Sequence, residues 1–263
     1  MTPVHAAARR AVRIGLAGLL AALAPSAVAA QGLGGVAGRE CGVSAAAAGA
    51  DIASRPDGEV LAAGQPVRLA GLAWPGGSAE AARAALEAWM ARGPARIVTL
   101  PGPPDRWGRP AVLPVRDGTL LAADLVAGGL AVVRPDDLPQ GCARALMALE
   151  RAAQVAGRGL WAAPAVQAGD LPALAALDGR YALVEGRIGS TSQGKAFLYL
   201  NFGTFETNGF TVTVPKRSLR RFEASGMTGV AVEGRRVRIR GVVVGTDRPR
   251  MEVTVPEAIE RLD

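Results

Sequence analysis

Hydrophobic positions in the first half of the chain switch between the spacing of strands and that of helices. A strand is predicted over residues 66–72, where Val and Leu follow the turn residues Gly64 and Gln65. A helix is predicted next, because apolar residues recur every three or four positions between the N-cap candidate Ser78 and the helix-breaking pair Gly93-Pro94. Its expected buried face consists of Ala82, Ala85, Leu86, Trp89 and Met90.

Two more strands and two more helices are predicted further along this half. The strands, at residues 96–100 and 111–115, flank a loop rich in Gly and Pro, and the helices follow at residues 119–128 and 142–156. After residue 161 the chain becomes a run of Ala and Pro with few charges, so we expect a linker at residues 164–177. The last helix should bury a stripe made of Cys142, Ala145, Leu146, Leu149, Ala153 and Ala156.

The last third of the chain has the pattern of strands with one short helix. Five strands with the helix between the third and the fourth are typical of an OB-fold barrel. The fourth strand alternates apolar residues with Arg236, Arg238 and Arg240. Together with Arg235, this row fits a solvated strand face or a nucleic-acid site, and the solvated face is the commoner arrangement. The strands are predicted at residues 181–188, 196–202, 210–214, 237–244 and 251–255, and the helix at 218–224.

The N-terminus is typical of a secretory signal peptide. Three arginines precede an apolar run over residues 14–24, and small residues follow as far as Ala30. The run is shorter than the roughly 20 residues that a membrane span needs. We therefore expect residues 1–30 to be cleaved, which gives an exported protein, periplasmic or secreted, without a transmembrane segment. The Arg9-Arg10 pair leaves the twin-arginine route open as an alternative.

Cleavage of this segment would change the available chemistry. It removes His5, the only histidine of the chain. A His base, a Ser-His-Asp or Cys-His nucleophile and a zinc site with a His ligand are then excluded. Because the segment carries three of the 30 basic residues and none of the 23 acidic ones, its removal lowers the formal net charge from +7 to +4. A charge this small gives only weak support for a polyanionic partner.

Cys41 and Cys142 both remain after cleavage, and in an exported protein such a pair is expected to form a disulfide. The bridge would close a loop of about 100 residues and stabilise the fold by several kcal/mol. The alternative is two free or buried thiols, because spacing alone does not test geometry.

Three motifs occur in order in the first half: residues 65–72 (QPVRLAGL), residues 105–109 (DRWGR) and residues 150–161, which end in Gly-Leu-Trp. In sequence and spacing they resemble the thermonuclease, or staphylococcal-nuclease-like, family. The resemblance implies an OB-fold barrel with packed helices that hydrolyses DNA or RNA. Family members use a calcium ion held by carboxylates, a Glu that activates water and two arginines that bind the phosphate.

Within this resemblance Arg68 and Arg109 match the two phosphate-binding arginines. The acidic half of the site has no match. Where the family has the calcium-binding Asp and the water-activating Glu, this chain has Ala73 and Gly76, and Pro75 keeps the register. We therefore expect no useful hydrolysis, which is the pattern of a pseudoenzyme.

The remaining metal-ligand position falls in a turn where only Asp57 or Glu59 matches. One carboxylate does not hold calcium tightly, because affinity rises with the number and charge of the oxygen ligands. No cofactor is therefore expected, and calcium only if an active nuclease recruits Asp57, Glu59 or Asp105. The two arginines have two interpretations: they bind phosphate, or they form structural ion pairs with Glu59 or Asp105.

Three aromatic residues are further binding candidates. Trp74 either stacks on a base or a sugar, or lies in the core or at its rim. Tyr199 and Phe202 lie on strands of the C-terminal module, which resembles a small β module that follows degenerate thermonuclease domains in exported bacterial proteins. Aromatic residues on such strands can stack bases, although alternation buries some of them.

The sequence thus predicts a mainly β, α+β protein of two tandem OB-like barrels, the first of the staphylococcal-nuclease type. The first domain is expected at residues 46–163, after a lead-in of residues 31–45, and the second at residues 178–263. The leading hypothesis is an exported, non-catalytic binding or scaffold protein for an anionic ligand such as single-stranded nucleic acid. The alternatives are an active calcium-dependent phosphodiesterase and a module that binds another protein of the cell envelope. The sequence does not define the oligomeric state.

Overall fold

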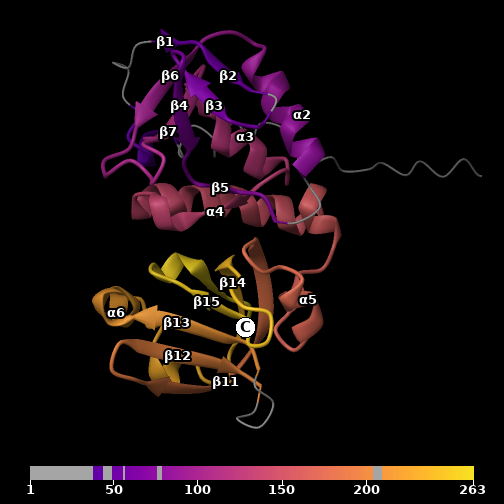
Figure 1. Ribbon diagram of the computed structural model, residues 1–263, viewed down its shortest axis with the longest axis vertical. Coiled ribbons are helices and arrows are strands. Elements are labelled where there is room, and N and C mark those ends of the chain that lie inside the picture. Colours follow the sequence, from indigo (N-terminus) through magenta and orange to yellow (C-terminus); the bar gives the residue numbers. More distant parts are fainter. Residues whose placement is uncertain (1–37, 44–48, 56, 76–78, 204–208) are drawn as a thin grey trace, which may run out of the picture.

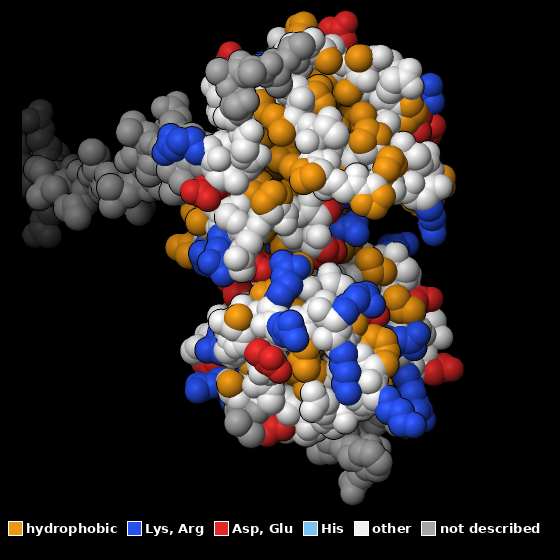
Figure 2. Space-filling model, turned by 90° about the vertical axis from the view of Figure 1, so that its left-hand side faces the viewer, with side chains coloured by type: hydrophobic (Ala, Val, Ile, Leu, Met, Phe, Trp, Pro, Cys, Tyr) orange, Lys and Arg blue, Asp and Glu red, His pale blue; other side chains and the backbone are white. Residues whose placement is uncertain are grey.

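Two β-sheets, each with its own hydrophobic core, form the upper and lower halves of the molecule (Figure 1). The structure is a computed structural model that describes residues 38–43, 49–55, 57–75, 79–203 and 209–263. The expected signal peptide lies outside these residues. Sheets predominate over helices, so the chain is an α+β protein rich in β structure, as predicted. In the space-filling view, acidic and basic side chains meet along the waist between the halves (Figure 2).

The N-terminal sheet has the strand order β1-β6-β7-β4-β3-β2, with β8 beside β7. Neighbouring strands are antiparallel except β4 and β7, which are parallel. The sequence predicted β4, β6 and β7 but none of the strands of two or three residues, which are too short to show alternation. The strands are β1 (Gly49–Ala50), β2 (Ile52–Ser54), β3 (Val60–Ala62), β4 (Gln65–Leu69), β6 (Ala95–Thr99), β7 (Ala111–Arg116) and β8 (Thr119–Leu120), and a separate pair joins β5 (Leu72–Ala73) to β9 (Val132–Val133).

Three helices pack in this half: α2 (Ala79–Met90), α3 (Leu121–Ala127) and α4 (Gln140–Val155). Their buried faces follow the predicted periodicity, with Trp89 and Met90 of α2 in the core. Ala156 is exposed because α4 ends one residue before it. The predicted stripe of α4 is otherwise buried at Cys142, Leu146, Leu149 and Ala153.

The C-terminal sheet has the order β15-β13-β12-β11-β14-β16, with β10 beside β11. The pairs β13–β15 and β10–β11 are parallel, and an isolated antiparallel bridge between Val244 and Arg250 joins the ends of β14 and β15. Among the described residues neither sheet closes into a continuous barrel. The strands are β10 (Val166–Gln167), β11 (Tyr181–Gln193), β12 (Phe197–Phe202), β13 (Thr211–Pro215), β14 (Arg236–Val242), β15 (Arg250–Glu252) and β16 (Ile259–Arg261), and the helices are α5 (Leu171–Ala175) and α6 (Leu219–Ala224).

The segment expected to be a linker has regular structure, because it contains β10 and α5. The Asp170 side chain caps α5 by accepting the Ala173 N–H at 3.1 Å, and Leu174 is fully buried in the C-terminal core. One amphipathic turn is too short to give a periodic signal in a run of Ala and Pro. Short 3-10 helices complete the chain at η1 (Pro135–Asp137), η2 (Gly159–Ala162), η4 (Lys216–Ser218), η5 (Gly229–Ala231) and η6 (Pro256–Ala258).

Across the part of the chain that the structure covers, the helices are all too short or too polar to cross a bilayer.

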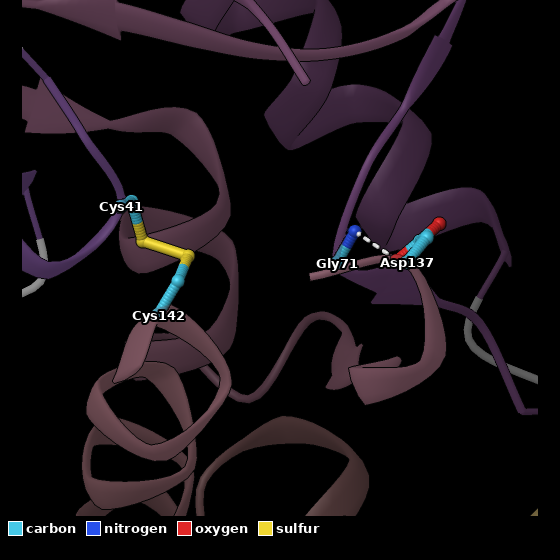
Figure 3. The surroundings of a disulfide bond; sticks show 4 residues. All are labelled: Cys41, Gly71, Asp137 and Cys142. Carbon is cyan, nitrogen blue, oxygen red and sulfur yellow. Dashed lines mark hydrogen bonds between the residues drawn. A yellow bond between two sulfur atoms is a disulfide. The ribbon is translucent and has the colours of Figure 1, made fainter. Parts of the chain in front are cut away.

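A disulfide joins Cys41 to Cys142 and confirms the predicted pairing (Figure 3). Both residues are buried in the N-terminal core, so the bond ties the start of the described chain to the first turn of α4. The two cysteines are 101 residues apart. The closed loop therefore includes all the described strands of the N-terminal sheet.

Removing this bond by the double change Cys41→Ala/Cys142→Ala should lower the free energy of unfolding by about 4–5 kcal/mol, because the unfolded chain regains the entropy of an open loop of this length. Urea unfolding followed by circular dichroism measures the change. Reductant should destabilise the wild type and leave the double variant unaffected. An equal response of both proteins to reductant would contradict a stabilising bond.

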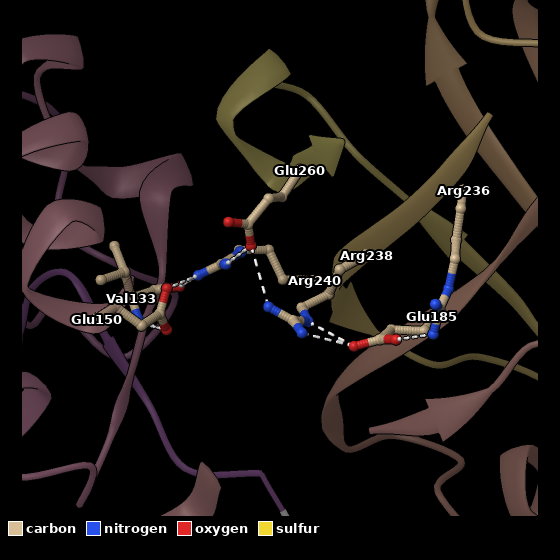
Figure 4. A network of polar contacts seen from close by, with 7 residues as sticks. All are labelled: Val133, Glu150, Glu185, Arg236, Arg238, Arg240 and Glu260. Carbon is tan, nitrogen blue, oxygen red and sulfur yellow. Dashed lines mark hydrogen bonds and ion pairs between the residues drawn. The ribbon is translucent and has the colours of Figure 1, made fainter. Parts of the chain in front are cut away.

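The two halves meet at a buried ion pair between β14 and α4 (Figure 4). Nη1 of Arg240 lies 2.6 Å from Oε2 of Glu150 and 3.2 Å from the carbonyl oxygen of Val133. The other carboxylate oxygen of Glu150 accepts the Val133 N–H at 3.0 Å. Burial alone would lower the pKa of Arg240, but the charge and hydrogen bond of Glu150, together with Tyr181 and the charge of Glu260, outweigh it and raise the pKa above its usual value. This guanidinium is therefore a permanent cation held inside the seam.

A second row of charges lies beside this pair (Figure 4). Glu185, Arg238 and Glu260 stand directly opposite one another on β11, β14 and β16. Arg238 donates to Glu185 at 2.6 and 3.0 Å and to Glu260 at 3.2 Å, and Arg236 reaches the other oxygen of Glu185 at 3.1 Å. The alternation predicted for this strand is correct, but its basic face is no solvated surface: Arg238 and Arg240 are buried under the N-terminal half.

The Arg240–Glu150 pair should show strong coupling. Arg240→Met alone should cost about 3–5 kcal/mol, because it leaves the Glu150 carboxylate buried and uncompensated. The further change Glu150→Gln removes that charge and should restore part of the loss. Denaturant unfolding of the two single variants and the double variant measures the coupling. The exposed pair Arg55–Glu59 is the control, with an expected coupling below about 1 kcal/mol. Additive costs at Arg240 and Glu150 would contradict a buried pair.

Candidate functional site

A cleft of about 410 Å³ lies where the two halves meet, and it contains both arginines singled out in the sequence. Arg68 is on β4, and the parallel register of β4 with β7 places it opposite Ala111. Arg109 comes two residues before that partner, so both side chains reach the same cleft. The lining residues come from both halves and include Glu59, Arg68, Ala73, Trp74, Arg109, Arg134, Gly179, Tyr181 and Val242.

Arg68 forms an ion pair with Asp137, which lies in η1, far along the chain. The same carboxylate accepts the Gly71 N–H at 3.0 Å through its other oxygen (Figure 3). Gly71 has a φ of +75°, and a Cβ there would meet the side chain of Leu138. Asp137 therefore fixes both the guanidinium of Arg68 and the tight turn that follows β4. Arg68 thus pairs with Asp137, which the sequence did not indicate, and not with Glu59.

Arg109 pairs with Asp105, one of the two partners considered from the sequence. The guanidinium lies 2.8 and 2.9 Å from the carboxylate, which also accepts the backbone N–H groups of Trp107 and Arg109. Burial alone would raise the pKa of Asp105, but these hydrogen bonds and the Arg109 charge lower it below its usual value. The Trp107 ring is 63% exposed, with the guanidinium groups of Arg106 and Arg109 at 3.9 and 4.8 Å from its centre. The loop is thus organised by its own side chains.

Arg134 is a cleft residue that the sequence reasoning missed. It follows β9, and its Nε lies 3.4 Å from Oδ2 of Asp136. The available signal was the run Arg134-Pro135-Asp136-Asp137, in which adjacent acids follow a basic residue at the end of a strand. That run supplies Arg134 to the cleft, and its two aspartates pair with Arg134 and Arg68.

Glu59 is the one acidic side chain among the described residues that line the cleft. Its carboxylate pairs with Arg55, and its backbone N–H donates to Asp57 at 3.0 Å. Asp57 therefore shapes the turn, and Glu59 faces the cleft. Within the described ranges, no three His, Cys, Asp or Glu side chains are grouped so that they could hold a metal ion.

Ala73 lies at the bottom of the seam between the halves. It is 6% exposed and forms a small apolar cluster with Val132, Tyr181 and Leu183, two of which belong to the C-terminal sheet. Burial raises the pKa of Tyr181 well above its usual value, so this phenol stays neutral. Its hydroxyl donates weakly to the Val133 carbonyl at 3.4 Å. Position 73 is therefore covered by the C-terminal half.

The indoles near this cluster are only partly buried. Trp74 packs against the N-terminal core and lines the cleft, and Trp161 packs against the apolar cluster of Ala73, Val132, Tyr181 and Leu183. Neither Nε1 has a hydrogen-bond partner among the described residues. Gly76, which the resemblance aligns with the water-activating Glu of the thermonuclease family, lies outside the described residues.

The two aromatic candidates of the C-terminal sheet point to opposite faces. Phe202 is buried in the core, where its ring centre lies 5.5 Å from that of Phe210, so it is not open to a base. Tyr199 is half-buried on the other face of β12, edge-on to Phe197. Period-two alternation along β12 causes this division. Neither residue lines the arginine cleft.

Comparison of the chain with models of known protein families finds no match, and a search among curated proteins finds none either. The thermonuclease resemblance therefore rests on the motifs of the sequence.

The burial of position 73 predicts the effect of restoring an acid there. Ala73→Asp should lower the free energy of unfolding by about 2–4 kcal/mol at pH 7, because the new carboxylate would be buried against the apolar side chains of Val132, Tyr181 and Leu183. Burial raises the pKa of the new group in the folded state, so the loss should be full at pH 7 and shrink as the pH falls towards 4.

Urea unfolding at pH 7 and pH 4.5 measures this loss. Ala73→Asn is the matched control, since it adds a polar group of similar size that does not titrate. Its cost should change little over the same range. A cost for Ala73→Asp below about 0.5 kcal/mol at pH 7 would mean that position 73 is open to solvent.

Proposed function

We propose that this protein is an exported, non-catalytic binding protein with a degenerate thermonuclease-like fold. Two OB-like units form it, and the cleft between them holds an anionic group, with a single-stranded nucleic acid as the expected ligand class. Calcium has no part in this function.

The shared strand order of the two halves supports two OB-like units. In the N-terminal half, counting β2, β3, β4, β6 and β7 as strands one to five gives the order 1-2-3-5-4. In the C-terminal half, β11 to β15 share the pairings 1-2, 2-3 and 3-5, and the Val244–Arg250 bridge adds a contact between strands four and five. Here strand one also pairs with strand four, a pairing that the N-terminal half lacks among its described strands. Strands three and five are parallel in both halves, and a helix, α2 or α6, lies between strands three and four.

The arrangement of the cleft carries the binding proposal. Arg68, Arg109 and Arg134 line one hollow, with Trp74 in its wall and Glu59 as the one acid among the described lining residues. Each guanidinium has five N–H donors, and the ion pair of each uses only part of them. Their side chains remain 28%, 27% and 40% exposed, so the free donors are within reach of a phosphate. Because the aspartate partners offset the charge, we expect modest affinity.

The binding proposal predicts salt-dependent retention of DNA. Residues 31–263 should bind a fluorescein-labelled single-stranded oligonucleotide with a dissociation constant on the order of 10 µM in low salt, weakening about 20-fold between 50 and 200 mM salt if three phosphates are contacted. Arg109→Ala/Arg134→Ala should weaken binding at least tenfold in fluorescence anisotropy. The control Arg92→Ala/Arg151→Ala removes the same charge from two exposed positions, one in the turn after α2 and one in α4, and should have little effect.

Two outcomes would contradict this function. Absence of binding at low salt, or an equal loss in both double variants, would remove the cleft as an anion site. Degradation of denatured DNA in calcium that is abolished by Arg109→Ala would establish an active nuclease instead.

A further inference from the structure

A second hollow, of about 510 Å³, lies on the C-terminal sheet and shares no lining residue with the arginine cleft. Its described lining consists mainly of hydroxyl, amide and guanidinium side chains, and no carboxylate is among them. This polar groove is formed by Ser190, Ser192, Tyr199, Asn201, Phe202, Gly209, Thr211, Arg248, Pro249 and Arg250.

Strand register aligns the polar side chains of the groove. Ser190, Asn201, Thr211 and Arg250 stand directly opposite one another on β11, β12, β13 and β15. The Asn201 amide donates to the Ser190 hydroxyl at 3.3 Å and accepts from the Thr211 hydroxyl at 3.4 Å. These hydrogen bonds are at the long end of the normal range, so they hold the side chains in one row and are weak enough to exchange for a ligand.

Tyr199 stands next to this row, opposite Ser192. Its ring lies edge-on to Phe197, with 6.2 Å between the ring centres, and is half-buried. Phe202 lies on the other face of β12, in the core. The groove therefore has one aromatic ring that is both packed and partly open, which is the arrangement of a stacking surface.

Arg248 and Arg250 supply the charge of the groove. Both are exposed, and neither forms an ion pair with another described residue. Glu252, which lies on β15 two residues after Arg250, pairs instead with Arg217 at 3.3 Å. The arginines of the groove thus differ from those of the cleft, each of which has an aspartate beside it. Basic side chains are also frequent on the face of the C-terminal half shown in Figure 2.

We propose that this groove binds nucleotide units. The planar base stacks on Tyr199, the phosphates lie against Arg248 and Arg250, and the Asn201 amide with the flanking hydroxyls binds polar edges of the base or the sugar. An amide offers a donor and an acceptor in one plane, which matches the edge of a base. This site does not depend on the cleft of the proposed function, because the two share no residue.

The experiment compares three probes on the whole mature chain: a labelled oligothymidylate, an abasic oligonucleotide of equal length and thymidine monophosphate. Tyr199→Ala should weaken oligothymidylate binding about tenfold and leave the abasic probe unchanged, because stacking is worth about this much per base. Tyr199→Phe keeps the ring and should bind as the wild type does. Arg248→Ala/Arg250→Ala should weaken both oligonucleotides and reduce the salt slope by about 1.4. Binding of the monophosphate would identify a free nucleotide as sufficient, and binding of the oligonucleotide alone would require a strand.

The control for charge is Arg220→Ala/Arg221→Ala, which removes two exposed arginines from α6. Circular dichroism confirms that each variant is folded. An equal loss in this control, or an equal effect of Tyr199→Ala on the abasic probe, would overturn the proposal. If the cleft does not bind DNA, Arg109→Ala/Arg134→Ala will leave oligonucleotide binding unchanged, while the groove variants still weaken it. The two sites can therefore fail separately.

Discussion

The buried ion pair between Arg240 and Glu150 fixes how the two halves meet, and the geometry of the cleft depends on it. A fully buried guanidinium costs several kcal/mol to desolvate, and that cost is met only where a carboxylate and further acceptors are in place. Glu150 supplies the charge and the Val133 carbonyl a second acceptor. The same carboxylate holds the N–H of Val133, so one side chain joins α4, β9 and β14. The apolar cluster around Tyr181 could slide, but sliding would separate these charges.

The way the two halves pack against each other determines which side chains are tolerated at position 73. Since β9 pairs with β5, fixing Val133 also fixes Ala73 under Tyr181 and Leu183. An acid at that place would be buried among apolar side chains, at a cost that is a large fraction of the stability of a domain. The seam that covers position 73 also forms one wall of the cleft.

The sequence was sufficient for elements with long apolar periodicity, such as α2, α4 and the strands of five or more residues. Most strands of two or three residues were missed because they show no periodicity, and β15 is the exception, since a strand was predicted at residues 251–255. Alternation placed Arg238 and Arg240 on one face of β14, but it carries no information about what covers that face, so their burial was missed. The disulfide followed from the cysteine count and expected export. The partner of Arg68 was out of reach, because Asp137 is brought beside it only by η1, 69 residues later.

The two arginine-lined surfaces differ in how they can attract an anion. In the cleft, each guanidinium lies beside an aspartate, so its field is nearly cancelled a few ångströms away and only its free N–H donors act at contact. In the groove, Arg248 and Arg250 have no acid among the described lining residues, and their field reaches about a Debye length, roughly 8 Å at physiological salt. In the proposal that both surfaces bind a polyanion, the groove therefore attracts it first. The cleft could select it only afterwards, by shape and by hydrogen-bond direction.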